Sequence, residues 1–468
     1  MSFKKWFKSL IGTKAFYRMV FMIAVPIIIQ NSITSFVNLL DNLMVGRLGT
    51  EQMSGVAVAN QLVFVYNLTL FGAVSGAGIF SAQFYGAGDY EGVKSAFRYK
   101  LLIVMGLFLV MAGVVLTAGP SLIMLYLSGS SDAGRVSVTL ECAYSYIRII
   151  LIGLFPFALS QCYSSTMKES GQTTVPMLAG VAAVLVNLTF NYLLIYGKFG
   201  FPELGVEGAA IATVMSRFVE CAIMIVYCRT HRNSLKWVDG LYKTLKVPGE
   251  LAKRITIKGF PLMANECLWS MGLAYLNQIY SLRGIDVVAA TNIQSTAFQL
   301  FDAIFIALGS ASSIIVGQTL GAGKMEKARD YSVKLQALTV WMSIVVGVIL
   351  YIAARYIPYL YNTSDEIREM ATDLLRVMAV LEIFRDYVNT AYFIIRSGGK
   401  TIITFLFDSA FTWVFCVPIA LMLTHYTSLS IVWIFFAVQC TELIKAVVGY
   451  ILLKRGVWVN NLVTAEKV

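Results

Sequence analysis

Acidic residues lie inside long apolar stretches of this sequence, and they are the residues best able to do chemistry there. Asp41 closes the first such stretch, Glu266 lies shortly after Pro261 in another, and Asp386 lies in a third. A charged side chain at the centre of a bilayer costs about 2.5–3.5 kcal/mol on insertion scales, so an acid there is a functional candidate by default. A carboxylate at that depth can bind and release a proton or hold Na⁺.

Polar residues precede Asp41 every three to four positions. At helical pitch they form one stripe, which predicts a helix face turned toward a cavity rather than lipid. The stripe consists of Gln30, Asn31, Thr34 and Asn38. Asp41 is the candidate for binding H⁺ or Na⁺; the alternative is that it marks the outer end of its helix, since Arg47 and Gly49 follow closely.

Neutral polar residues in the fifth and sixth apolar stretches could complete this site. Asn187 and Asn191 are spaced i, i+4 and therefore share one helix face. Their carbonyl oxygens can coordinate a hard cation, or their amides can hydrogen-bond a neighbouring helix. Thr213, in the following stretch, is a weaker candidate of the same kind.

The second half of the chain holds further candidates for cation or substrate binding. They are Glu266, Asp302, Asp386, Gln299 and Asn292. Asn292, Gln299 and Asp302 form a stripe on one expected helix, and Glu382 shares a helix face with Asp386. Arg385 lies beside Glu382 and Asp386 on that helix, and an ion pair between Arg385 and one of these two acids would be a structural neutralisation. Glu442 and Lys445 are predicted to form a structural i, i+3 pair.

The composition indicates that the chain is a polytopic membrane protein. Hydrophobic residues make up 58% of 468 positions and charged residues 13%, against about 25% charged in soluble domains. The mean hydropathy is +0.72. We predict an all-α integral membrane protein with twelve transmembrane helices, each long enough to cross a bilayer. The expected spans are 19–40, 52–80, 93–118, 141–167, 174–196, 208–228, 255–280, 289–316, 328–357, 369–395, 402–423 and 429–453.

The basic residues orient these spans. With the N-terminus in the cytoplasm, most of the 37 Lys and Arg fall in cytoplasmic segments, as the positive-inside rule requires. We therefore expect a multi-pass protein of the plasma membrane with both termini cytoplasmic and a retained basic leader. The net charge of +11 then reflects loops that face anionic lipid, and no coherent basic face indicates nucleic-acid binding.

A duplication divides the chain into two similar halves. The motif at 83–88 recurs at 318–323, an offset of 235 residues that Pro26 and Pro261 also share. Six spans per repeat give both halves the same topology, related by a pseudo-two-fold axis along the membrane normal. We predict an N-lobe (1–228), a cytoplasmic linker (229–254) and a C-lobe (255–468), with substrate bound near the midplane between or within the lobes. The protein is expected to be a monomer in contact with membrane lipid.

Several classes of chemistry are disfavoured by the sequence. The seven cysteines and two histidines show no metal-ligand or redox spacing. The Gly-Ala-Gly segments lack the strand-to-helix context of a phosphate loop and predict tight turns instead. We therefore expect no enzyme activity and no cofactor, with energy supplied by an ion gradient or a partner ATPase.

Five segments together resemble the multidrug and toxic compound extrusion (MATE) family, bacterial type. These segments are 41–49, 83–88, 205–213, 317–323 and 396–401, with a proline in the first span. The resemblance covers nearly the whole chain and implies two six-helix lobes. It also implies export of organic cations and drugs in exchange for inward H⁺ or Na⁺.

The resemblance also assigns residues. The family's N-lobe cation site uses a first-helix Asp, matched by Asp41, a fifth-helix Asn, matched by Asn187, and a sixth-helix Thr, matched by Thr213. Asn191 stands where the family often has Asp, which removes one titratable group. Glu266 and Asp386 resemble acids that some members use in the C-lobe.

The functional hypothesis is therefore a cation-coupled antiporter for organic cations, drugs or metabolites that works by rocker-switch alternating access. A flippase for lipid-linked oligosaccharide is the closest rival. A flippase would need a cationic cavity for pyrophosphate, whereas the intramembrane charge here is mainly acidic. A membrane-embedded enzyme is a second rival, and a sensor or scaffold without flux is a third.

Overall fold

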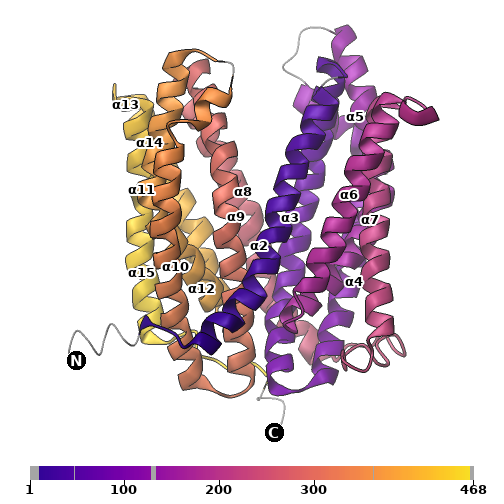
Figure 1. The fold of residues 1–468 in the computed structure, drawn as a ribbon, viewed down its shortest axis with the longest axis vertical. Coiled ribbons are helices and arrows are strands. Elements are labelled where there is room, and N and C mark those ends of the chain that lie inside the picture. Colours follow the sequence, from indigo (N-terminus) through magenta and orange to yellow (C-terminus); the bar gives the residue numbers. More distant parts are fainter. Residues whose placement is uncertain (1–9, 47, 128–132, 362, 464–468) are drawn as a thin grey trace. The chain divides into compact units, whose positions relative to one another are not determined.

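The computed structural model describes residues 10–46, 48–127, 133–361 and 363–463, and this part of the chain is helical without strands. The first half contains α2 (Lys14–Gly46), α3 (Thr50–Ala87), α4 (Tyr90–Leu127), α5 (Ala133–Glu169), α6 (Thr174–Tyr196) and α7 (Gly205–Thr230). The second half contains α8 (Gly249–Ser281), α9 (Ile285–Gly321), α10 (Met325–Ala353), α11 (Asp365–Ser397), α13 (Val417–Tyr426), α14 (Ile431–Gln439) and α15 (Thr441–Arg455) (Figure 1).

The eleventh helical rod departs from regular α-helix. It starts as α12 (Thr401–Phe405) and passes through two π-helical segments, η3 (Leu406–Ala410) and η4 (Thr412–Cys416), before α13. Each π segment takes more residues per turn than an α-helix, and such segments often mark functional positions. Single 3-10 turns, η1 (Lys198–Gly200) and η2 (Ile357–Leu360), occur in connections. Together with the pair α14–α15, these elements confirm the predicted all-α fold of twelve helical rods.

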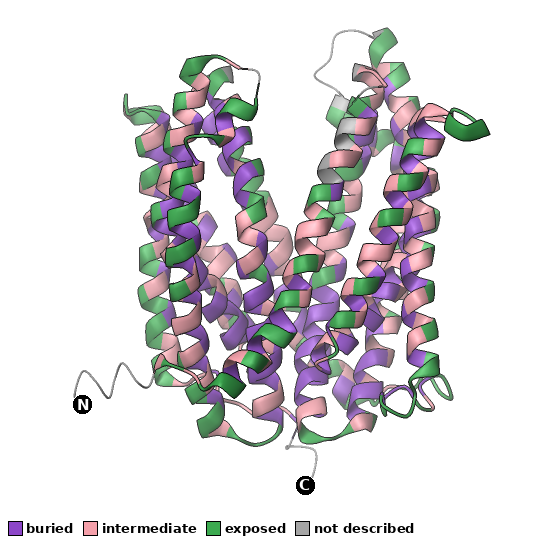
Figure 2. Ribbon diagram, in the orientation of Figure 1, coloured by how far each residue is buried: buried purple, intermediate pink, exposed green. Residues whose placement is uncertain are grey.

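Ten segments of the described chain are long and apolar enough to cross a membrane. Two helices are absent from that group, α8 and α11, although each has 33 residues and so a length of about 50 Å at 1.5 Å per residue. They carry the candidate acids Glu266 and Asp386. Exposed residues recur along the helices rather than at their ends alone (Figure 2), and many are large and apolar, such as Leu109 and Ile352. Lipid would cover such a surface.

The chain forms two compact units. Unit 1 contains residues 1–28, 82–88 and 260–468, and unit 2 contains residues 29–81 and 89–259. The start of α2 thus packs with the second half of the chain: Phe16 and Val20 are buried in one core with Leu308 of α9 and Leu335 of α10. The start of α8 belongs in the same way to unit 2. The first turns of α2 therefore belong to the unit built mainly from the second half, and the first turns of α8 belong to the unit built mainly from the first half.

The duplicated glycine motifs contact each other inside unit 1. A Cβ atom on Gly86 would lie 1.9 Å from the carbonyl oxygen of Gln318, and a Cβ on Gly321 would lie 1.9 Å from the carbonyl oxygen of Gln83. Because 86 and 321, and likewise 83 and 318, differ by 235, the two copies pack reciprocally at one backbone crossing. The turns that follow use a positive φ of 74° at Gly88 and at the equivalent glycine, Gly323, which confirms the predicted glycine turns.

The C-terminal segment closes over this crossing. The amide nitrogen of Gln83 donates to the carbonyl oxygens of Ser397 at 2.9 Å and Asn460 at 3.2 Å. The side-chain oxygen of Gln83 accepts from the backbone nitrogen of Leu462 at 2.7 Å. The repeated glutamine is therefore a structural residue that ties the end of α3 to the end of the chain.

Candidate ion and substrate sites

Unit 2 brings together the residues predicted for the first site. Asp41 lies on α2, Asn187 and Asn191 lie one turn apart on α6, and Thr213 lies on α7, which packs against α6. Asn191 donates from Nδ2 to Asp41 Oδ1 at 2.6 Å and to Asn187 Oδ1 at 3.2 Å. Asn187 and Asn191 are both buried. The i, i+4 spacing on α6 thus places two amides against one carboxyl group.

The Asn187 amide can take two orientations, and they differ in what they offer Asp41. In one, its Nδ2 donates to Thr213 Oγ1 at 3.2 Å while its oxygen faces Asp41. In the other, its nitrogen lies 3.0 Å from both Asp41 oxygens and its oxygen accepts from Thr213. A carboxylate can only accept hydrogen bonds, so the second orientation suits an ionised Asp41. The first suits an Asp41 that carries a proton or shares a cation with the amide oxygen.

The stripe on α2 has mixed environments. Gln30 packs against α6, where a Cβ on Gly180 would lie 3.1 Å from Gln30 Nε2. Asn31 is half-buried, and Thr34 is exposed and donates to the carbonyl oxygen of Gln30 at 2.9 Å. The side chain of Asn38 lies outside the described residues. The structure therefore places Gln30 against a neighbouring helix and leaves Thr34 exposed.

Arg217 is a residue near this site that the sequence reasoning did not single out. It follows Thr213 by one helical turn on α7 and is close enough to Asp41 to attract its carboxylate. Its guanidinium lies 4.5 Å from the centre of the Phe157 ring and 3.4 Å from Glu220 Oε2. The i+4 spacing from Thr213 was the signal that could have revealed it.

In unit 1, Arg385 forms an ion pair with Asp302 of α9, and not with an acid of its own helix as the sequence suggested. Arg385 Nη2 lies 3.1 Å from Asp302 Oδ1, and its guanidinium lies 4.5 Å from the centre of the Phe298 ring. On the same predicted stripe of α9, Asn292 and Gln299 are exposed. Arg385 therefore neutralises the charge of Asp302, whereas the side chains of Asn292 and Gln299 are exposed on the surface of α9.

Asp386 and Glu266 lie in different surroundings within unit 1. Asp386 is 1% exposed and accepts from Ser343 of α10 at 2.6 Å. Glu266 on α8 lies near Tyr392 and near the charge of Arg396, both on α11. The two acids that resemble one C-lobe site thus have different neighbours.

The residue next to Glu266 organises the π-helical segment. Asn265 is 1% exposed; it donates to Asp408 at 3.0 Å and accepts from the Ser409 hydroxyl at 2.6 Å. Lys445 of α15 lies 2.9 Å from Glu442, which confirms the predicted i, i+3 pair, and 3.9 Å from Asp408. Asn265 was missed because a single amide beside an acid gives no periodic signal.

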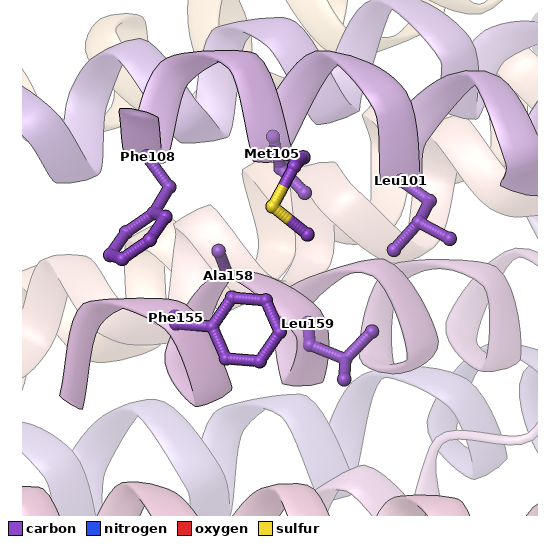
Figure 3. Close-up of a pocket in the computed structure, with 7 residues that line it drawn as sticks. Leu101, Met105, Phe108, Phe155, Ala158 and Leu159 are labelled. Atoms are coloured by element: carbon purple, nitrogen blue, oxygen red, sulfur yellow. The ribbon is translucent and has the colours of Figure 1, made fainter. Parts of the chain in front are cut away.

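A small pocket between α4 and α5 carries no polar chemistry. It is lined by Leu101, Val104, Met105 and Phe108 of α4 and by Phe155, Ala158 and Leu159 of α5 (Figure 3). With seven apolar side chains and no donor or acceptor among them, it is a packing defect between two helices. Among the described residues, no group of three His, Cys, Asp or Glu side chains could hold a metal ion.

Comparison with known proteins places this arrangement in a family. The MatE family model matches residues 26–193 and 261–422, one segment in each half of the chain. The chain belongs to the MatE family. Members of this family are membrane transporters, so the protein is a transporter and not an enzyme.

Individual relatives agree over almost the full length. The chain is 25% identical to a probable multidrug resistance protein NorM of Thermotoga maritima, covering 95% of this chain and 94% of that one. It is 24% identical to a probable multidrug resistance protein YoeA of Bacillus subtilis, covering 96% and 95%. A solved MATE transporter in a bent conformation has a TM-score of 0.84 at 20% identity, with 96% of each chain covered. An outward-facing multidrug resistance MATE transporter has a TM-score of 0.83 at 20% identity, covering 96% and 97%.

Proposed function

We propose that this MatE transporter is a cation-coupled antiporter that exports organic cations, drugs or metabolites in exchange for H⁺ or Na⁺. The names of its relatives, probable multidrug resistance proteins, support the substrate class. We place it as a monomer in the plasma membrane with both termini cytoplasmic. Its two lobes would alternate access to substrate bound near the bilayer midplane.

One observation carries the proposal: Asp41, a lone carboxyl group, faces two buried amides inside a helix bundle. Asn191 donates to Asp41 at 2.6 Å, and the Asn187 amide lies 3.0 Å from both of its oxygens. Oxygens of this kind suit H⁺ or a hard cation such as Na⁺. With asparagine at 191, the site has one titratable group and would exchange one charge at a time.

The orientation of the Asn187 amide would depend on the charge state of Asp41, and this orientation would determine the hydrogen bond between Asn187 and Thr213 on α7. When Asp41 is ionised, the amide nitrogen turns to it and the Thr213 hydroxyl donates to the amide oxygen. When Asp41 is neutralised, the amide oxygen turns to it, and Thr213 donates to the carbonyl oxygen of Ala209, 3.0 Å away. Cation binding on α2 is thereby coupled to a hydrogen-bond exchange on α7.

Antiport requires that cation and substrate disfavour each other's binding. Such coupling is reciprocal: the factor by which one ligand weakens the other is the same in both directions. A cationic substrate would favour ionised Asp41, and a bound H⁺ or Na⁺ would remove that attraction. The exposed and half-buried polar residues of unit 1, Asn292, Gln299 and Glu266, are our candidates for additional substrate contacts.

The experiment is transport of a cationic dye into everted membrane vesicles, driven separately by a pH gradient and by a Na⁺ gradient. We expect one of the two gradients to drive dye uptake into the vesicles. Asp41→Asn should abolish that uptake at normal protein levels, whereas Asp286→Asn, a change at an exposed acid on α9, should preserve it. Full gradient-driven transport by Asp41→Asn would refute the assignment of Asp41.

A further inference from the structure

The connection between α6 and α7 exposes an aromatic side chain on a strained backbone. Phe199 has a φ of 55° and a ψ of 31°, and it is the one non-glycine residue of the described chain with a positive φ. This left-handed conformation is costly for a residue with a Cβ atom, and it persists only where the surrounding structure enforces it, often at functional positions. Phe199 is also 87% exposed, so packing within the protein does not stabilise its ring.

Contacts with α6 hold this connection, residues 197–204, in place. The backbone nitrogen of Leu204 donates to the carbonyl oxygen of Leu194 at 2.8 Å. The ring of Phe201 packs edge-on against that of Phe190, with 6.4 Å between the ring centres. In Figure 1 the connection turns outward from the two helices that it joins. Phe199 therefore projects from a loop that is braced against α6.

The length and the exposed face of α6 place this loop at the surface of a bilayer. Leu178, Leu185 and Tyr192 are exposed, and their spacing of seven residues puts them on one helix face, which lipid would cover. With 23 residues, α6 is about 34 Å long, close to the roughly 30 Å of a hydrocarbon core. By contrast, α4 has 38 residues and, at about 57 Å, is long enough to extend beyond the headgroups. The loop after α6 therefore lies at the level of the headgroups.

The residues around Phe199 are of the types that suit a membrane interface. Tyr192 and Tyr196 lie in the last turns of α6, with their ring centres 6.0 Å apart, and the exposed Lys198 adjoins Phe199. Tyrosine rings are enriched at the headgroup level, and a lysine there can direct its ammonium group to lipid phosphates. A phenylalanine held out into water gains nothing from its ordered position, whereas among headgroups its ring is removed from water.

We propose that residues 197–204 anchor α6 in the headgroup region of the bilayer, with the Phe199 ring inserted among the lipids. With both termini in the cytoplasm, this is the outer leaflet. The Tyr196 hydroxyl donates to the carbonyl oxygen of Met44 at 3.0 Å, which links the end of α6 to the end of α2, the helix of Asp41. The anchor therefore sets the level of these two helices in the membrane, and it is independent of the coupling ion and of the substrate.

Paramagnetic broadening of a fluorine NMR signal tests where the Phe199 ring lies. para-Fluorophenylalanine is placed at position 199 of the full-length protein in nanodiscs of phosphatidylethanolamine and phosphatidylglycerol. We expect a nitroxide on the lipid headgroup to broaden the signal more than a nitroxide at the end of the acyl chain or an aqueous gadolinium chelate. The same label at Phe218, an exposed residue in the middle of α7, should broaden most with the acyl-chain nitroxide. Strongest broadening at position 199 by either of the other two probes would overturn the proposal, and so would no broadening by any of them, the result expected if a protein covers the ring.

Hydrogen exchange in the same nanodiscs tests whether the ring holds the loop. Phe199→Asn removes the ring, and asparagine tolerates the left-handed conformation, so the variant should fold with less strain. If the ring projected only into water, the amides of residues 197–204 would exchange no faster in this variant than in the wild type. With the ring among lipids, they should exchange about tenfold faster, whereas Phe199→Tyr should keep the slow exchange because tyrosine suits the same interface. Exchange in Phe199→Asn as slow as in the wild type would contradict the anchoring role.

Discussion

Lys100 gives the sharpest prediction about stability, because it is a lysine with no solvent exposure inside an apolar helix bundle. Its side chain on α4 is 0% exposed. Its Nζ lies 2.6 Å from Ser165 Oγ, 3.0 Å from Thr166 Oγ1 and 2.6 Å from Glu169 Oε2, all on α5. Three partners satisfy the three ammonium protons, so the charge is fully paired within unit 2.

Replacing Lys100 by methionine removes the counter-ion but leaves Glu169, whose side chain is 11% exposed. Breaking a buried ion pair from one side costs about 3–5 kcal/mol. Because Glu169 keeps some exposure and the 3.1 Å bond from Ser165, we expect the lower end, about 3 kcal/mol. The double variant Lys100→Met/Glu169→Gln should recover most of that loss, since replacing both charges of a buried pair is often neutral.

The assay is a double-mutant cycle on the free energy of unfolding in mixed detergent micelles. Lys94→Met is the control on the same helix: the Lys94 side chain is 11% exposed, but that of its partner Glu91, 2.6 Å away, is 77% exposed. Water solvates Glu91 when the lysine is removed, so we expect a loss of about 0–1 kcal/mol. The reasoning would be refuted if Lys100→Met cost no more than Lys94→Met, or if the double variant were as unstable as the single one.

Two further predictions concern packing in unit 1. Gly86→Ala and Gly321→Ala should each lower the free energy of unfolding by about 1–3 kcal/mol or prevent folding, because the new Cβ meets a carbonyl oxygen of the opposite repeat. The measurement is thermal denaturation, and the control is Gly106→Ala on α4 in unit 2, which should be neutral because a Cβ there would have nothing within 4 Å. Asn265→Ala should cost about 1–3 kcal/mol, because Asp408 loses a hydrogen-bond donor and the buried Ser409 backbone nitrogen loses its side-chain acceptor, while the Ser409 hydroxyl keeps the backbone carbonyl of residue 265. An unchanged melting midpoint would contradict this.

Local patterns in the sequence predicted the helices and the composition of the first site. Apolar runs located the twelve rods, since a bilayer requires long apolar helices. The i, i+4 spacing of Asn187 and Asn191 predicted that both amides share one face, and the structure places both near Asp41. The domain limits and the roles of these residues in transport remain predictions.

Contacts between distant segments could not be read from local patterns. The pairing of Lys100 with Glu169 and of Arg385 with Asp302 depends on which helices pack together and in what register. The shared face of Glu382 and Asp386 was visible in the spacing, but the burial of Glu382 without a donor depends on its surroundings. The hydrogen bonds between Asn265 of α8 and the π-helical residues Asp408 and Ser409 are likewise contacts that the local sequence does not predict.

The most direct test of the central claim is cation release on substrate binding. Purified wild-type protein in weakly buffered detergent solution, loaded with H⁺ or Na⁺, should release the coupling cation when a cationic dye is added. At dye concentrations high enough to offset the lost attraction, Asp41→Asn should release fewer cations per dye molecule bound, because the carboxyl group that exchanges them is gone. Equal release by the wild type and Asp41→Asn, or dye binding without any release from the wild type, would contradict the account.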